Sequence, residues 1–187
     1  MKAVVRLVLG AAALAAAGPA FASRNLEGLV VDTFYNRCVT PLLAGDAPDI
    51  DGLPDPADAT QIGTPGHEIL FENVDGPMNL RIRTLADGLH TCILSLKLEG
   101  DFATEQVAGA LESRLTDKGF TRIASCADGH DVYATGPQGA VGTYLTVMSY
   151  SIRPGAVRPD QFGLIAAESA DAPDASSICL QATGVQP

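Results

Sequence analysis

The sequence contains no tryptophan, and aromatic residues make up only 5% of its 187 residues. Basic residues are also scarce, since 12 Lys and Arg stand against 22 Asp and Glu, for a formal net charge of −10. Binding to phosphate backbones requires clustered Lys and Arg. The composition therefore argues against a nucleic-acid partner and against attraction to anionic membranes.

Signatures of catalysis and of redox or phosphate chemistry are missing as well. The sequence has no G-x-S-x-G nucleophile elbow and no C-x-x-C pair. His67 and Glu68 begin like a zinc-protease motif, but Phe71 occupies the position of the second histidine. The glycine-rich stretch 136–142 lacks the Lys-Ser/Thr pair of a phosphate loop. We therefore predict no catalytic residue and no cofactor.

The longest apolar run lies at the N-terminus and is shorter than the roughly 20 residues that cross a bilayer. Lys2 and Arg6 form a short basic region, small apolar residues follow up to Ala17, and small residues precede the Ala22–Ser23 bond. This pattern is typical of a secretory signal peptide. We expect residues 1–22 to be removed by cleavage between Ala22 and Ser23, and the protein to be periplasmic or secreted, with no membrane span.

The remaining residues 23–187 have the length of one ordinary domain. Loss of the two leader cations takes the formal net charge from −10 to −12. A strongly acidic surface favours solubility in an exposed compartment.

Four cysteines, an even number, meet an oxidising environment after export. Two disulfides are expected, with three possible connectivities. Cys38 lies on an apolar helical stripe and Cys92 on the apolar side of a strand, so a Cys38–Cys92 bridge is favoured. Cys126 then pairs with Cys179, which would tether the polar tail 170–187.

The periodicity predicts an α+β fold. Apolar residues recur every four positions over 25–40, and Pro41 is expected to end this helix. A second helix is expected from Asp101, as N-cap, to the C′ residue Gly119. Strands are expected at 68–72, 79–85, 89–98, 121–126, 131–135 and 141–152, with a further candidate at 162–169. The expected architecture is a single domain in the order α-βββ-α-βββ, with both helices on one face of an antiparallel sheet of about six strands.

Residues 44–66 form a long acidic loop rich in proline and glycine. Its carboxylates Asp49, Asp51, Asp55 and Asp58 resemble part of a calcium-binding loop. The match is incomplete, because Ala47 stands where a full loop begins with a carboxylate and Asp58 replaces the longer glutamate. These four residues are a candidate calcium site, and the alternative is a solvated loop.

The expected strand 141–152 is apolar on both faces. Tyr144, Met148 and Tyr150 share one face, and Leu145 and Val147 lie on the other. A strand of this kind is usually covered on both sides. If the tyrosine face were exposed, it would suit a partner surface.

Together these features indicate an exported, non-catalytic binding or accessory domain for a protein or a small ligand, for example an inhibitor of an envelope protein. A small hydrolase with non-local catalytic residues is the first alternative, and a pocket joining His67, His90 or His130 to a serine or carboxylate would favour it. A calcium-dependent binding module that uses the loop 49–58 is the second alternative.

Overall fold

The structure is a computed structural model that describes residues 26–56, 59–97, 102–126, 131–137, 142–152, 161–174 and 178–179. The expected signal peptide and its cleavage site lie outside these residues. Within them, no helix is long and apolar enough to cross a membrane.

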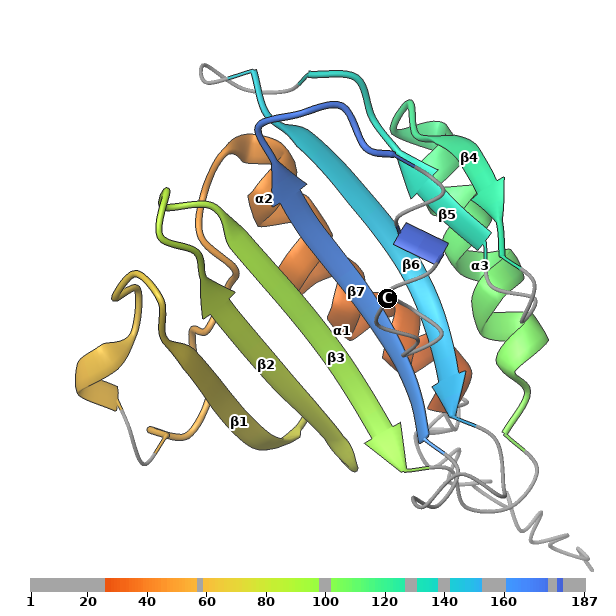
Figure 1. Ribbon diagram of the computed structural model, residues 1–187. Helices are drawn as coiled ribbons and strands as arrows, with labels where there is room; N and C mark the ends of the chain where they lie inside the picture. Colours follow the sequence, from red (N-terminus) through yellow and green to blue (C-terminus); the bar gives the residue numbers. More distant parts are fainter. Residues whose placement is uncertain are drawn as a thin grey trace, which may run out of the picture.

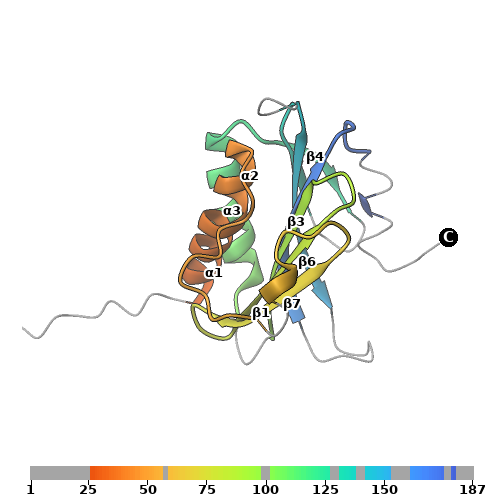
Figure 2. The ribbon, with the colours of Figure 1, turned by 90° about the vertical axis from the view of Figure 1, so that its left-hand side faces the viewer.

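The molecule has two main layers, helices on one face and a seven-stranded sheet beside them (Figures 1 and 2). The helical segments are α1 (Leu26–Phe34), the π-helical turn η1 (Tyr35–Val39), α2 (Thr40–Ala44), the short η2 (Ala59–Gln61) and α3 (Thr104–Asp117). The strands are β1 (Glu68–Val74), β2 (Met78–Thr84), β3 (His90–Lys97), β4 (Thr121–Ser125), β5 (Asp131–Ala134), β6 (Tyr144–Ile152) and β7 (Gln161–Ser169).

All neighbouring strands are antiparallel, in the order β1-β2-β3-β7-β6-β5-β4. The α+β class and the order of elements are as expected, but the sheet has seven strands rather than about six. The candidate at 162–169 forms β7, which lies at the centre of the sheet between β3 and β6. Phe162, Leu164 and Ala166 alternate toward the buried side, which gives this strand its place in the core.

The main core fills the space between the helices and the sheet. The four-residue stripe of the first helix is confirmed, since Val30, Phe34 and Cys38 are fully buried there. Val107, Leu111 and Leu115 of α3 bury the second stripe. Both helices therefore occupy the same face, as expected (Figure 2).

Pro41 does not end the first helix, contrary to the expectation. The chain widens to the π-helical turn η1, where the Thr40 N–H bonds the Tyr35 carbonyl, and α2 then continues across the proline. Because Pro41 has no N–H, the Arg37 carbonyl lacks its usual helical donor. The Asp49 N–H in the acidic loop takes that place at 2.8 Å. A contact from a distant segment thus makes the proline compatible with a continuing helix.

Helix α3 begins later than expected. Ala103 occupies the N-cap position, not Asp101, which lies outside the described residues. Ala103 has no side-chain oxygen to cap the helix, and Glu27 of α1 accepts its N–H at 3.2 Å. The C-terminal end is as expected, with Gly119 at a φ of +83° and the Phe120 N–H donating to the Leu115 carbonyl.

Both disulfides are present, with the favoured pairing. Cys38–Cys92 joins η1 to β3 inside the main core. Cys126–Cys179 joins the residue after β4 to the C-terminal segment on the opposite face of the sheet. There a second, smaller apolar cluster forms, in which Ile178 packs with Val132 and Met148.

Candidate functional site

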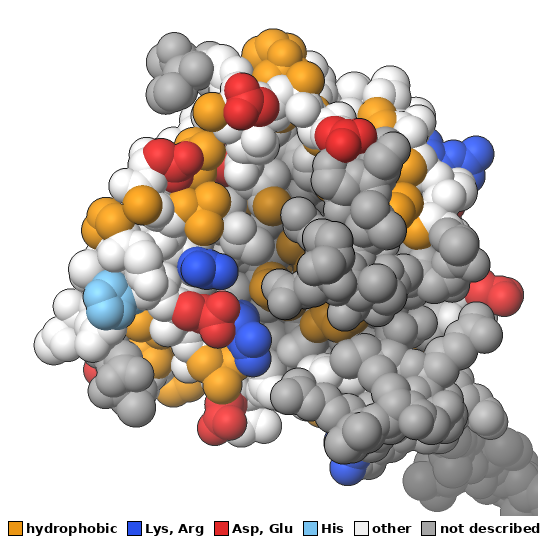
Figure 3. Space-filling model, in the orientation of Figure 1, with side chains coloured by type: hydrophobic (Ala, Val, Ile, Leu, Met, Phe, Trp, Pro, Cys, Tyr) orange, Lys and Arg blue, Asp and Glu red, His pale blue; other side chains and the backbone are white. Residues whose placement is uncertain are grey.

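A pocket of about 640 Å³ lies on the face of the sheet that the helices leave free, which we call the open face. Its floor comes from β3, β7 and β6, and its wall from the segment after β7. In Figure 3, hydrophobic side chains are visible in a recess near the middle of this face. The lining residues are Thr91, Ile93, Thr146, Met148, Tyr150, Ile165, Ala167, Glu168, Ser169, Ala172, Pro173, Asp174 and Ile178.

Cross-strand pairing arranges the floor in three rows. From β3 through β7 to β6, the rows are Thr91–Ala167–Thr146, Ile93–Ile165–Met148 and Ser95–Gly163–Tyr150. Because directly opposed residues share a face, each row projects as a unit toward the same side. The floor therefore has an apolar middle, two threonine hydroxyls at one end and a tyrosine ring at the other.

Tyr150 owes its position to the absence of a side chain at Gly163. A Cβ built on Gly163 would lie 2.2 Å from Cε1 of Tyr150, so the ring occupies the space above the glycine. The Tyr150 hydroxyl forms a hydrogen bond with Ser95 on the far side of that glycine. Burial raises the pKa of Tyr150, while Arg81 and the Ser95 hydrogen bond oppose the increase. The ring is thus neutral at physiological pH and closes one end of the pocket.

Glu168 of β7 is a buried residue that lines the other end of the pocket, with 9% of its surface exposed. Its Oε2 accepts the His90 N–H at 2.8 Å, which extends the link between β7 and β3 beyond their ladder. The alternation of β7 places Glu168 on the same side as Ala166 and Leu164, toward the helices. Its carboxylate therefore lies on the helix side of the sheet, where the His90 backbone engages it.

The segment that forms the wall is fixed at two points. After β7, the Ser169 hydroxyl donates to the Asp171 carbonyl at 2.9 Å and accepts the Asp171 N–H at 3.2 Å. Farther along, Cys179 is bound covalently to Cys126, and Ile178 lines the pocket. The wall is thus held to the sheet by a turn and a disulfide.

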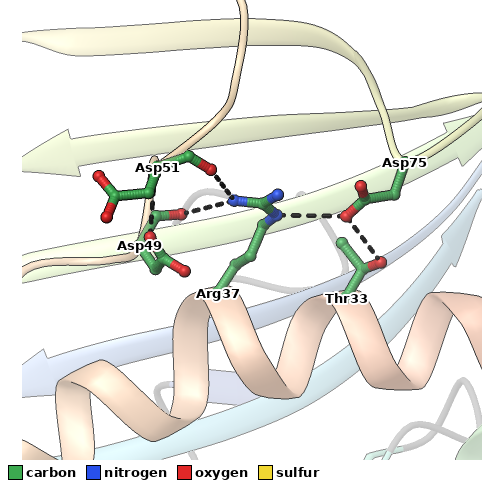
Figure 4. A network of polar contacts seen from close by, with 5 residues as sticks. All are labelled: Thr33, Arg37, Asp49, Asp51 and Asp75. Carbon is green, nitrogen blue, oxygen red and sulfur yellow. Dashed lines mark hydrogen bonds and ion pairs between the residues drawn. The ribbon is translucent and has the colours of Figure 1, made fainter.

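The acidic loop meets the helix through Arg37 (Figure 4). The guanidinium donates to the carbonyl oxygens of Asp49 and Asp51 at 3.3 and 3.2 Å, and to the Asp75 carboxylate at 3.2 Å. Thr33 also donates to Asp75, at 3.2 Å. Arg37 thereby joins the helix, the acidic loop and the β1–β2 turn.

Three of the four calcium candidates, Asp49, Asp51 and Asp55, lie in the described part of the acidic loop. The Asp49 carboxylate accepts the Asp51 N–H at 2.9 Å, while Asp55 lies farther along, beside β1. Asp58 lies outside the described residues. In the described part of the chain, no three or more His, Cys, Asp or Glu side chains gather to hold a metal ion. Calcium binding by the whole set stays a prediction.

Neither of the two described histidines of the hydrolase alternative is among the residues that line the open-face pocket. His67 is exposed, and Nδ1 of His90 lies 3.4 Å from the Thr84 hydroxyl oxygen. His130 lies outside the described residues. Tyr144, Met148 and Tyr150 were expected to share one face of their strand, and of these Met148 and Tyr150 line the pocket.

Sequence reasoning missed the pocket wall and the buried Glu168. The Cys126–Cys179 disulfide places the wall beside the sheet. The sequence favoured this pairing, but it did not indicate which part of the sheet the tail would cover. Glu168 carries a usable signal, because it continues an apolar alternation that includes Leu164 and Ala166. A carboxylate on the core side of a strand indicates a buried polar contact.

Comparisons with protein-family models, with curated proteins and with solved structures find no match to this chain.

Proposed function

We propose that this protein is an exported binding domain and that it holds a small, mainly apolar molecule in the open-face pocket. The observation that carries the proposal is the pocket itself. Its volume of about 640 Å³ lies within the roughly 300–1,000 Å³ typical of ligand sites. Such sites combine apolar walls with a few placed polar groups, and the rows of the floor have that composition.

The shape of the floor favours an elongated ligand. Residues two apart on one strand are about 6.6 Å apart, so the three rows extend over about 13 Å. The body of the ligand lies over Ile93, Ile165 and Met148. A hydroxyl or carbonyl group at one end meets the hydroxyls of Thr91 and Thr146, and an apolar or aromatic end meets Tyr150.

A small ligand fits the surface better than a protein partner at this site. Among the described residues, the exposed large hydrophobic side chains are Ile62 and Leu70, each 42% exposed. Protein docking sites usually present a contiguous apolar patch. The apolar area of the open face is instead gathered inside the pocket, beneath the segment bound by Cys179.

Export fits this design, because the wall depends on a disulfide. Disulfides persist in oxidising compartments and are rare where thiols are kept reduced. We therefore propose that residues 1–22 act as a signal peptide and that cleavage occurs before Ser23. The intact mass of the exported protein should begin at Ser23, and a mass that retains the leader would contradict this part of the proposal.

Titration with the neutral dye Nile red tests ligand binding directly, because its fluorescence rises in apolar sites. The Ala167→Phe substitution places a ring on the pocket floor and should weaken binding at least about tenfold. The matched control, Ala86→Phe, adds the same ring to the exposed β2–β3 turn and should bind as the unchanged protein does. Equal binding by both variants, each with an unchanged melting temperature, would refute the pocket as the site.

A further inference from the structure

The outer edge of β1 has backbone groups that face away from the sheet. The Thr84 N–H of β2 donates to the His67 carbonyl. This bond shows which residues of β1 direct their backbone groups toward β2. Successive residues of an antiparallel strand direct their N–H and C=O groups to opposite sides. Ile69 and Phe71 therefore bond to β2, and Glu68 and Leu70 direct their backbone groups outward, up to the register shift that follows Phe71. No described strand pairs with this edge.

A groove of about 530 Å³ runs along this edge. One side is β1, from Glu68 to Asn73, and the other is the acidic loop at Pro54, Asp55 and Pro56. Arg37 binds this loop upstream, at the Asp49 and Asp51 carbonyls, and so holds it beside the helix. The groove is thus bordered by hydrogen-bonding backbone on one side and by an anchored loop on the other.

We propose that this groove binds an extended, basic peptide, which adds to β1 as an eighth strand. Strand addition satisfies the outward N–H and C=O groups of Glu68 and Leu70, and gives affinity that is largely independent of sequence. The charge of the groove selects the peptide. Asp55, Glu68 and Glu72 line the groove, with Glu68 in an ion pair with Arg81 of β2 at 3.4 Å, and no lysine or arginine is among the lining residues.

The side chains of β1 define the pattern of the peptide. Glu68, Leu70 and Glu72 all project from the open face, with Leu70 42% exposed between the two acids. Directly opposed residues on neighbouring strands interact most strongly. The matching peptide therefore carries basic residues four positions apart, with an apolar residue midway between them.

A second copy of this chain is a poorer occupant. Antiparallel pairing of two β1 strands about Leu70 sets Glu68 of each copy opposite Glu72 of the other. Like charges in directly opposed positions are destabilising. The same acids that attract a basic peptide therefore oppose this homodimer.

The test uses a seven-residue peptide, acetylated and amidated, with lysine at its second and sixth positions, leucine at the fourth and valine elsewhere. Isothermal titration should show binding by this peptide and binding at least about tenfold weaker by the version with glutamates in place of the lysines. Methylation of the peptide amides that face β1 should abolish binding, because those amides supply the ladder hydrogen bonds.

Two protein variants separate the roles of backbone and charge. Leu70→Pro removes an outward N–H without removing a bond to β2, and proline is tolerated at such edge positions. This variant should lose the lysine peptide. Glu72→Lys keeps the backbone, and should lower affinity for the lysine peptide and raise it for the glutamate peptide. Both variants should keep Nile red binding, so this inference and the pocket function can fail separately.

Three results would overturn the inference. They are no binding by the lysine peptide, equal binding by the lysine and glutamate peptides, and full binding to Leu70→Pro with an unchanged melting temperature. A dimer of the unchanged protein that Leu70→Pro dissociates would assign the edge to a second copy, and would also overturn it.

Discussion

At the scale of single residues, Arg37 joins three segments that are distant in the sequence. Its side chain is 15% exposed and reaches two carbonyl oxygens of the acidic loop as well as Asp75. Because the Asp75 carboxylate is 42% exposed, solvent screens that ion pair, and the carbonyl contacts carry more of the stabilisation.

Replacing Arg37 by methionine should therefore lower the free energy of unfolding by about 1–3 kcal/mol, because partly buried carbonyls lose their donors. Asp75→Asn, which removes the ion pair and leaves the loop contacts in place, should cost no more than about 1 kcal/mol. Denaturant unfolding measures both. A larger loss for Asp75→Asn than for Arg37→Met would assign the main effect to the ion pair.

The position of the Tyr150 ring depends on the absence of a side chain at Gly163. An alanine at position 163 would bring its Cβ to 2.2 Å from the Tyr150 ring. The ring must then move, at a cost of about 1–3 kcal/mol in stability. In a Tyr150→Ala background the same Gly163→Ala change should cost much less, because the obstacle is gone. A double-mutant cycle on unfolding free energies measures this coupling, and equal costs in both backgrounds would show that the ring is not placed as described.

At the scale of elements, local pattern predicted most strands because alternation and turn residues agree along β1, β2 and β3. It failed at Pro41, where the helix continues through a π-helical turn and the Asp49 N–H serves the Arg37 carbonyl. It also failed at the start of α3, where Glu27 of another helix binds the Ala103 N–H. Both errors involve a hydrogen-bond partner that is remote in sequence, and a local pattern cannot supply one.

In the pocket as well, local pattern predicted the strand face but not the contact from a remote segment. Met148 and Tyr150 were predicted to share one face of their strand, and both line the pocket. What covers them depends on where the chain beyond β7 returns. The favoured pairing of Cys126 with Cys179 fixed that return, although its consequence for the open face emerged only in three dimensions.

The two disulfides close loops of nearly equal length, with separations of 54 and 53 residues. Each constrains the unfolded chain by about 4 kcal/mol in the chain-entropy model. Replacing Cys38 and Cys92 by alanine should cost about that much, since both are fully buried in the main core. Replacing Cys126 and Cys179 should cost less, because the tail can detach while the core stays folded, yet it should weaken Nile red binding more. Thermal unfolding and dye titration of the two double variants distinguish these effects, and the reverse ranking in dye binding would contradict the role of the tail as a pocket wall.

At the scale of the whole molecule, the two faces of the sheet differ in what covers them. The helix face holds the main core and one disulfide. The open face is divided, with Glu68, Arg81 and Arg83 exposed on β1 and β2 and the pocket on β3, β7 and β6. We propose the part of the open face on β3, β7 and β6 as a ligand site, which is the central claim.

Methyl NMR during a Nile red titration tests that claim most directly. The methyl resonances of Ile93, Ile165 and Met148 should shift, because these side chains form the apolar row of the pocket floor. Those of Met78 and Leu80, buried on the helix face, should stay in place. Shifts confined to the helix-face methyls, or no shift in the pocket row at saturating dye, would contradict the account.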